Sequence, residues 1–207
     1  MIVTAMEEYI KGKYKIYLDE QFAFVLYKGE LRRFMIKLGQ ELSESEYEEI
    51  INEIILKRSK RRTLHLLEKM DRTEQQIRKK LREGFYPEDI IDKAVEYAKN
   101  YHYINDFNYA TRYIDCKGSV KSKLEILSEL KQKGINKDIV NSIYEEANIN
   151  EKEVLVSLIK KKLGDNNTPD KNQVRKLMTY FSRKGFRMED INKAILSIYN
   201  ISNEYYA

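Results

Sequence analysis

The chain has few residues that interrupt helices and almost no cysteine. Its 207 residues include two prolines and eight glycines, the two residue types that break or weaken helices most strongly. Charged residues make up 34% of the chain, and Leu, Ile, Glu and Lys are abundant, as in amphipathic helices. The single cysteine, Cys116, has no partner for an intrachain disulfide or a cysteine zinc cluster. We therefore expect a mostly helical protein in which Cys116 is a small helix residue.

Long apolar runs are also missing. No stretch of eighteen apolar residues occurs, and the first residues, "MIVTAMEEYIKGKYK", lack the apolar core and the cleavage site of a secretory signal. We therefore expect a cytoplasmic protein that does not bind membranes.

Motifs for catalysis and for cofactors are absent as well. The two histidines, His65 and His102, are thirty-seven residues apart, and neither has a glutamate or histidine at the i, i+4 spacing of a helical zinc site. The segment "KKKLGDNNTPDK" contains neither a phosphate-binding loop nor a dinucleotide fingerprint. Asp106 has no second positioned carboxylate or histidine for acid-base work, so helix capping explains it better. We expect no enzyme activity, no metal and no cofactor.

Charge is present in quantity and is unevenly placed. Residues 1–56 hold seven Lys/Arg and eleven Asp/Glu, and the remaining residues hold thirty-one and twenty-two, so a net charge of −4 is followed by +9. A basic body behind an acidic head suggests a polyanion or an acidic protein groove as partner, and the plainer reading is a solvated surface with scattered lysines.

Residues 1–42 have the pattern of a small β-containing head. In residues 13–26 apolar and charged residues alternate up to Asp19-Glu20-Gln21 and then resume, which predicts two strands joined by a turn. Residues 1–9 supply a third strand, because an isolated hairpin is only marginally stable in water. The segment "GELRRFMIKLGQEL" predicts a short helix closed by Gly39.

A long helix is predicted to start at Ser43. Ser43 and Glu46 have the spacing of a capping box, and isoleucines recur behind them at helical intervals. The stripe continues into "KRSKRRTLHLLEKM", so we expect a helical junction between head and body.

The rest of the chain contains a short sequence motif that occurs three times. "LREGF", "LKQKGI" and "FSRKGF" place Gly84, Gly134 and Gly185 after three basic helical stretches, where glycine can end a helix in the left-handed conformation. The apolar residue that follows each glycine is expected to pack back on the helix it has just left. Thr73 with Gln76, Ser119, and Thr168 with Pro169 are the expected starts of these helices.

Each repeat resolves into three helices, and the sequence predicts four parts. These are a β-hairpin and short-helix head at 1–42, a first helical module with its lead-in helix at 43–104, and three-helix modules at 105–149 and 150–207. Because one module buries little by itself, stacked neighbours are expected to supply the missing core and to form an elongated body.

The stretch "YINDFNYATRYI" resembles a motif of the RecX family. The family motif reads Tyr, Ile or Leu, Asn or Asp, Asp, two variable residues, Tyr or Phe, and Ala; the matching residues are Tyr103, Ile104, Asn105, Asp106, Tyr109 and Ala110. The repeats and the head also resemble those of RecX proteins, so the likeness covers nearly the whole chain. The departures are a hairpin turn without glycine and an extra residue after Gly84, and the first leaves the turn type open.

The resemblance implies tandem three-helix modules and a role in homologous recombination, DNA repair and the SOS response. It implies binding to filaments of the recombinase RecA on DNA, with inhibition or modulation of strand exchange and ATP hydrolysis and without a catalytic site. RecA and single- or double-stranded DNA are the expected partners of a monomer. A general nucleic-acid-binding repeat protein and a helical scaffold that binds no DNA remain as alternatives.

Basic residues cluster near the repeat glycines and on the lead-in helix, where they are candidates to contact DNA or the filament. A solvated face, and cations that complement the helix dipole, are the plainer explanations. The candidates are Arg58, Lys60, Arg61, Arg62, Arg78, Lys79, Lys80, Arg82, Lys131, Lys133, Arg175, Lys176, Arg183 and Lys184.

Five tyrosines lie within the motif or close to it in the sequence, at positions 97, 101, 103, 109 and 113. They are candidates to stack on bases, but at such spacings packing in the core or at its boundary is the expectation, and the motif as a whole is expected to be structural. His65, on a leucine-rich stripe, is expected to be partly buried.

Overall fold

The computed structural model describes residues 1–163 and 169–199. The chain divides into two compact units, Met1–Asn105 and Asp106–Ala207, and each is described by itself. Among the described helices, none is both long and apolar enough to span a membrane.

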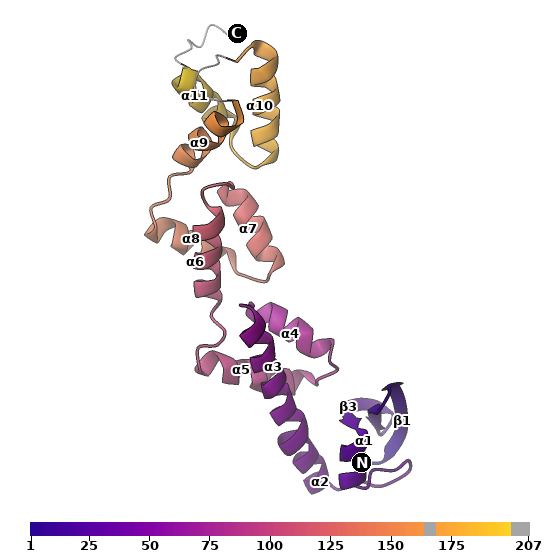
Figure 1. Ribbon diagram of the computed structural model, residues 1–207. Coiled ribbons are helices and arrows are strands. Elements are labelled where there is room, and N and C mark those ends of the chain that lie inside the picture. The colour runs from indigo at the N-terminus through magenta and orange to yellow at the C-terminus, as the bar shows by residue number, and fades with distance from the viewer. Residues whose placement is uncertain (164–168, 200–207) are drawn as a thin grey trace. The chain divides into compact units, whose positions relative to one another are not determined.

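The first unit opens with a three-stranded antiparallel sheet of order β1-β2-β3 (Figure 1). The strands are β1 (Val3–Ile10), β2 (Lys13–Leu18) and β3 (Gln21–Tyr27), so the predicted hairpin and third strand are confirmed. Ile16 pairs with Phe24 in register, and both side chains are buried. Asp19 and Glu20 form the turn with φ of 46° and 67°, the two left-handed residues of a type I′ hairpin, which this turn achieves without glycine.

The predicted short helix ends earlier than expected. Helix α1 (Lys28–Arg33) stops before Met35, which takes the left-handed φ of 51°. The prediction that Gly39 closes it was therefore wrong. Gly39 lies in a later turn, where its N–H donates to Val3 O at 2.8 Å and fastens the loop to β1.

A continuous helical run links the sheet to the first three-helix group, as predicted. It comprises α2 (Glu44–Glu49), the π-helix η1 (Ile50–Leu56) and α3 (Lys57–Lys69). Ser43 and Glu46 form the expected capping box. Ile50, Ile51 and Ile55 are buried and join the sheet residues in one core, so the run holds the sheet in place.

Helices α4 (Glu74–Arg82) and α5 (Glu88–Asn100) pack with α3. Thr73 caps α4 together with Gln76, as predicted. Leu66, Ile77, Leu81 and Ile91 belong to the core of this group.

Phe85, and not Gly84, takes the left-handed position at the end of α4. Its φ is 60°, where Gly134 and Gly185 have 87° and 91° in the other two repeats. The extra residue of the first repeat is thus accounted for: the N–H of Tyr86 donates to Leu81 O at 3.2 Å, as Ile135 does to Leu130 and Phe186 to Phe181. Position 84 favours glycine for a different reason, because a Cβ there would lie 3.0 Å from the ring of Tyr86.

Phe85 does not fold back on its own helix. Its ring contacts Tyr9 edge-on at a centroid distance of 5.2 Å and lies 4.1 Å from Lys15 Nζ. The prediction for this residue was wrong, because Tyr86 takes the packing role and Phe85 is left to contact the sheet.

The second unit contains two further three-helix groups (Figure 1). The first comprises α6 (Asp106–Lys117), α7 (Lys123–Gln132) and α8 (Lys137–Glu146), and the second α9 (Glu151–Leu163), α10 (Lys171–Arg183) and α11 (Met188–Tyr199). Each group has its own apolar core. A mostly helical protein with tandem three-helix groups and a small N-terminal sheet is therefore confirmed. The four-part division by residue number stays a prediction.

Two predicted helix starts were wrong in the second unit. Ser122, not Ser119, caps α7 through the N–H of Glu125. Asp170 caps α10 together with Gln173, so the helix begins after Thr168 and Pro169, of which Thr168 lies outside the described residues. In both cases the true cap stands three residues before the Glu or Gln that completes a capping box.

Candidate binding surfaces

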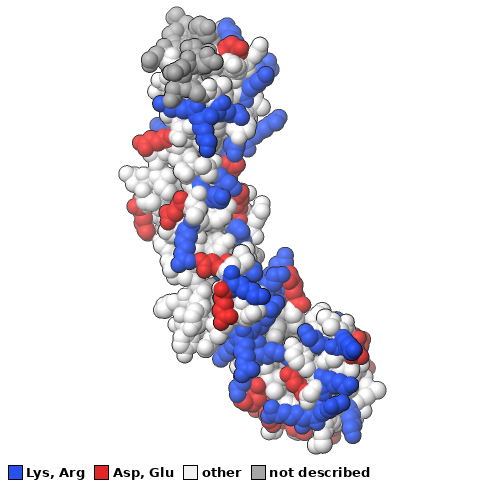
Figure 2. Space-filling model, viewed as in Figure 1, with Lys and Arg blue, Asp and Glu red and all other residues white. Residues whose placement is uncertain are grey.

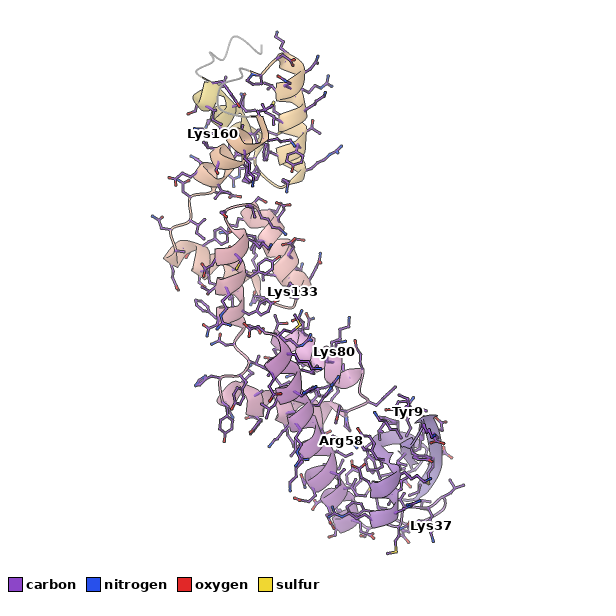
Figure 3. All side chains as sticks on the ribbon, in the orientation of Figure 1. Tyr9, Lys37, Arg58, Lys80, Lys133 and Lys160 are labelled. Carbon is purple, nitrogen blue, oxygen red and sulfur yellow. The ribbon has the colours of Figure 1, made fainter. Side chains whose placement is uncertain are left out.

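Arg58, one of the predicted cations on α3, makes its contacts within the chain. Arg58 is only 18% exposed; it pairs with Glu30 at 3.0 Å, donates to Val25 O, and lies 4.4 Å from the ring centroid of Tyr27. Figure 3 shows it between the long helix and the sheet. Arg58 therefore joins sheet and helix, and its charge is already compensated.

Three cations near the end of α4 are paired with carboxylates. Arg78 contacts two carboxylates, Glu74 at 2.8 Å and Asp92 at 2.5 Å. Lys80 contacts Glu83 at 2.7 Å, and Arg82 contacts Glu88 at 2.6 Å. The hydrogen bond from Arg82 holds the pKa of Glu88 below its usual range. Much of the positive charge that the sequence places here is offset by neighbours.

Four predicted cations of the first unit form no salt bridge among the described residues: Lys60, Arg61, Arg62 and Lys79. The charge of Lys79 helps to lower the pKa of Glu83, but Lys80 is the salt-bridge partner of that carboxylate. Arg61, Arg62 and Lys79 are exposed. Figure 2 shows Lys and Arg side chains gathered over α3 and α4 on the visible face. These four residues, called the α3–α4 cations below, are the part of the unit best able to attract an anion.

In the second unit, cations of two different three-helix groups come together. One groove of about 780 Å³ is lined by Lys131, Arg183 and Lys184, and a neighbouring one of about 650 Å³ by Arg175, Lys176, Arg183 and Lys184. Of these, only Lys184 has a carboxylate partner among the residues that the structure describes, Glu125 at 3.3 Å. We call Lys131, Arg175, Lys176, Arg183 and Lys184 the α7–α10 cluster.

The contact between α7 and α10 is fixed by close packing. Ser122 Oγ donates to Lys184 O, and a Cβ at Gly185 would lie 2.8 Å from Leu124 Cβ. Glycine is therefore needed at 185 both for its left-handed φ and for this approach. The cap of one helix and the end of another thus hold the cluster together.

Lys133 has a different environment from the other predicted cations. Its Nζ lies 6.0 Å from the ring centroids of both Tyr109 and Tyr113. Tyr113 donates to Glu129, which Lys121 also contacts, and burial together with that carboxylate raises the pKa of Tyr113 to about 12. Lys133 belongs to this intrachain network.

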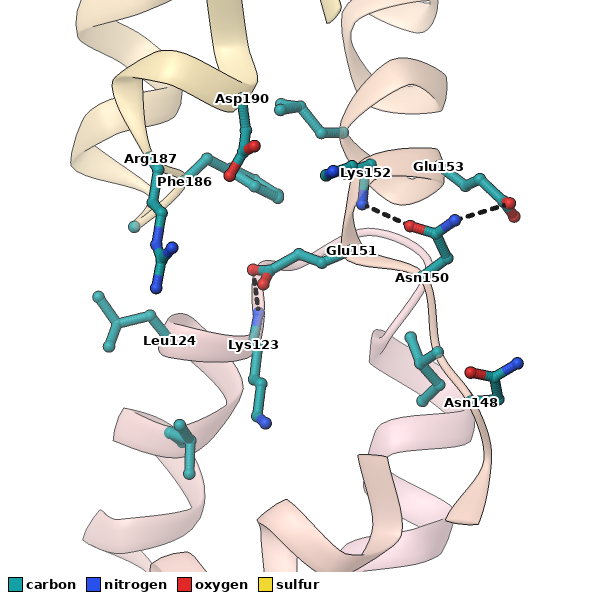
Figure 4. Close-up of a pocket in the computed structure, with 14 residues that line it drawn as sticks. Lys123, Leu124, Asn148, Asn150, Glu151, Lys152, Glu153, Phe186, Arg187 and Asp190 are labelled. Carbon is teal, nitrogen blue, oxygen red and sulfur yellow. Dashed lines mark hydrogen bonds between the residues drawn. The ribbon is translucent and has the colours of Figure 1, made fainter. Parts of the chain in front are cut away.

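A second cavity of about 780 Å³ lies between the two three-helix groups of this unit (Figure 4). Glu151 accepts the N–H of Lys123 at 3.1 Å, and Asn150 contacts both Lys152 and Glu153. Arg187 and Asp190 line the other side. The lining is mixed in charge, and within the described chain no group of three metal-ligating side chains occurs.

The motif residues have separate environments. Ile104 and Ala110 are buried, Tyr109 packs against the core of the α6–α8 group, and Asp106 is the first residue of α6. Tyr103 is 53% exposed, so packing does not account for its ring.

Three expectations for single residues were wrong. Tyr101 and Tyr103 are 60% and 53% exposed, where core or boundary packing was expected. His65 is also exposed, because it lies on the outer face of α3, 3.7 Å from Glu68.

The apolar lining of the first α7–α10 groove was not predicted from the sequence. Leu124 is 59% exposed, and it lines the first groove beside Leu127 and Ile135. Its position at the second residue of α7, outside the buried face of Ile126 and Leu130, is the signal that points to it.

Comparison with known proteins identifies the family. Residues 60–97 match the model for "RecX, first three-helix domain", and residues 150–195 match "RecX, third three-helix domain". The regulatory protein RecX of Caldanaerobacter subterraneus subsp. tengcongensis is 31% identical over 199 residues, 94% of this chain and 98% of that protein. The chain belongs to the RecX family. The resemblance seen in the sequence is thereby confirmed.

Other RecX proteins agree over similar lengths. The regulatory protein RecX of Clostridioides difficile is 27% identical, with 99% of this chain and 98% of that protein covered. The RecX crystal structure from Lactobacillus salivarius covers 70% of this chain and 97% of its own, with a TM-score of 0.61 at 24% identity. A second RecX crystal structure covers 99% and 96%, with a TM-score of 0.51. These structures support the fold, and the relatives' shared name is that of regulatory proteins.

Proposed function

We propose that the chain regulates the recombinase RecA by binding its filaments on DNA and inhibiting or modulating strand exchange and ATP hydrolysis. Membership of the RecX family supports a regulatory role. The single observation that carries the proposal further is the α7–α10 cluster, in which Lys131, Arg175, Lys176 and Arg183 have no acidic partner in the described parts of the chain. Cations without a partner are the groups that gain most from a phosphate or a carboxylate.

The proposed role needs binding and no catalytic group. The α7–α10 cluster and the α3–α4 cations lie in different units, so one chain offers two sets of contacts. Linked weak contacts raise the overall affinity when both sets engage one filament. Such a chain acts in the cytoplasm, where the filament forms, and as a monomer.

The test compares two variants with the same change in net charge. One carries Lys131→Glu, Arg175→Glu and Arg183→Glu in the cluster; its matched control carries Lys11→Glu, Lys28→Glu and Lys37→Glu, three exposed lysines of the head. We expect the cluster variant to need about tenfold more protein for half-inhibition of RecA strand exchange and DNA-dependent ATP hydrolysis. The control should inhibit like the unmodified chain.

Reversing the paired cations is a weaker test. Charge reversal at Arg78 or Arg82 would place like charges against Glu74, Asp92 and Glu88, and the resulting repulsion would disturb the fold of the group. The unpaired residues Arg61, Arg62 and Lys79 are the ones to change in the first unit.

Two other functions make different predictions. A general nucleic-acid-binding protein would bind DNA in a salt-sensitive way and leave both RecA rates unchanged. A helical scaffold would neither bind DNA nor inhibit. Unchanged RecA rates at saturating protein would therefore reject the proposal, and DNA binding would then decide between the other two.

A further inference from the structure

Three tyrosine rings lie together at the end of α5. The ring centroids of Tyr97 and Tyr101 are 4.8 Å apart, and those of Tyr101 and Tyr103 are 6.1 Å apart with planes only 18° from parallel. Tyr101 and Tyr103 are 60% and 53% exposed. We call these three residues the tyrosine platform. Large aromatic surfaces of this kind are usually buried when packing is their purpose.

The backbone holds the platform in place. His102 takes the left-handed φ of 59°, and the N–H of Tyr103 donates to Ala98 O at 2.8 Å. This is the bond that closes a helix in a Schellman turn. The two exposed rings therefore stand on either side of a closed turn, and binding a ligand would cost little backbone entropy.

A cation adjoins the platform. Lys60 Nζ lies 4.6 Å from the ring centroid of Tyr97, and Arg61 and Arg62 follow it on α3, also without an acidic partner among described residues. The surface thus joins flat aromatic faces to positive charge. That pair of features is what proteins use to bind single-stranded nucleic acid, where bases stack on rings and phosphates meet cations.

We propose that the tyrosine platform binds unpaired bases of single-stranded nucleic acid, with Lys60 and its neighbours on α3 contacting the phosphates. A duplex is a poorer ligand, because its bases are already stacked on each other. An apolar protein partner fits less well, because the charge of Lys60 would lie beside it. The inference deepens the proposed function by naming a ligand of the first unit, and it can be tested without RecA.

The first experiment distinguishes binding to the bases from binding to the phosphates. The double variant Tyr101→Ala, Tyr103→Ala should bind a short oligothymidylate about tenfold or more weakly than the unmodified chain, since stacking on an aromatic side chain contributes about that much per base. Binding to an abasic oligonucleotide of the same length, which keeps the phosphates, should be weak and equal for both. Phe107→Ala, which removes an exposed ring from α6, is the matched control and should change neither.

The second experiment reports stacking directly. The chain has no tryptophan, so Tyr101→Trp creates a single emitter on the platform. Phe22→Trp creates a single emitter on β3 of the same unit, where Phe22 is 40% exposed and contacts Tyr17 and Phe85. We expect oligothymidylate to quench the first strongly and the second little, and the abasic strand to quench neither.

Several results would overturn the inference. Equal oligothymidylate affinity for the unmodified chain and the double alanine variant, with no quenching of Tyr101→Trp, would exclude base stacking. If the double alanine variant instead loses inhibition of RecA while its DNA binding is unchanged, the platform contacts a protein and not the bases. Because the α7–α10 cluster is tested by RecA inhibition and the platform by DNA alone, either proposal can fail while the other stands.

Discussion

Phe85 contacts the sheet from a strained, left-handed backbone conformation. A side chain in the left-handed region costs roughly 1–2 kcal/mol relative to glycine, and the other two repeats avoid this cost with Gly134 and Gly185. The ring of Phe85 meets Tyr9, Lys15 and Phe22 of the sheet. The strain is kept because these contacts join the sheet to the first three-helix group.

Two substitutions separate the strain from the contact. Phe85→Ala should lower the free energy of unfolding of the first unit by about 1–2 kcal/mol, because it removes the aromatic and cation contacts and keeps the strain. Phe85→Gly removes both, so it should be about 1 kcal/mol more stable than Phe85→Ala. Urea unfolding followed by circular dichroism measures both values. If the alanine variant is the more stable of the two, the backbone at Phe85 is not strained.

At the scale of the element, α7 depends on its N-cap residue, Ser122. Ser122 accepts the N–H of Glu125, and its hydroxyl donates to Lys184 O from α10. One side chain thus begins a helix and joins two three-helix groups of the second unit. Ser119 precedes the helix and is exposed.

The two serines make a matched pair of variants. Ser122→Ala should cost about 1–2 kcal/mol of stability, because it removes a helix cap and leaves a carbonyl without its donor. Ser119→Ala should change stability by less than about 0.5 kcal/mol, as surface substitutions usually do. Thermal unfolding of both variants checks the difference. Equal effects would mean that the helix does not start at Ser122.

At the scale of the whole molecule, burial is divided between the two units. The sheet and the α3–α5 group hold one set of buried residues, including Ile16, Ile50 and Ile90. The α6–α8 and α9–α11 groups hold others, including Ile114 and Phe181. A core that closes within its own unit is the condition for independent folding.

We therefore expect fragments 1–105 and 106–207 to fold separately. Each should unfold cooperatively, and the far-ultraviolet circular dichroism of the two should add up to that of the intact chain. A fragment that is unstructured alone but folds when mixed with the other would show that the cores depend on each other.

The sequence by itself was enough for features that depend on neighbouring residues. Alternation predicted the strands, isoleucine spacing predicted the run through α3, and the capping boxes at Ser43 and Thr73 were found at their observed positions. The motif that begins at Tyr103 also led to the RecX family, which the comparisons confirm. These features are local because a helix start, a turn or a periodic face is set within a few residues of chain.

Only the tertiary structure decided which charged and aromatic groups are available. Arg58 and Arg62 look alike in the sequence, but Glu30, 28 residues away from Arg58, compensates the first and not the second. Lys131 and Arg183 share a groove although they belong to different repeats, and Tyr101 is exposed where spacing suggested packing. Ion pairing and exposure depend on residues that are distant in the chain and become neighbours only when the helices pack.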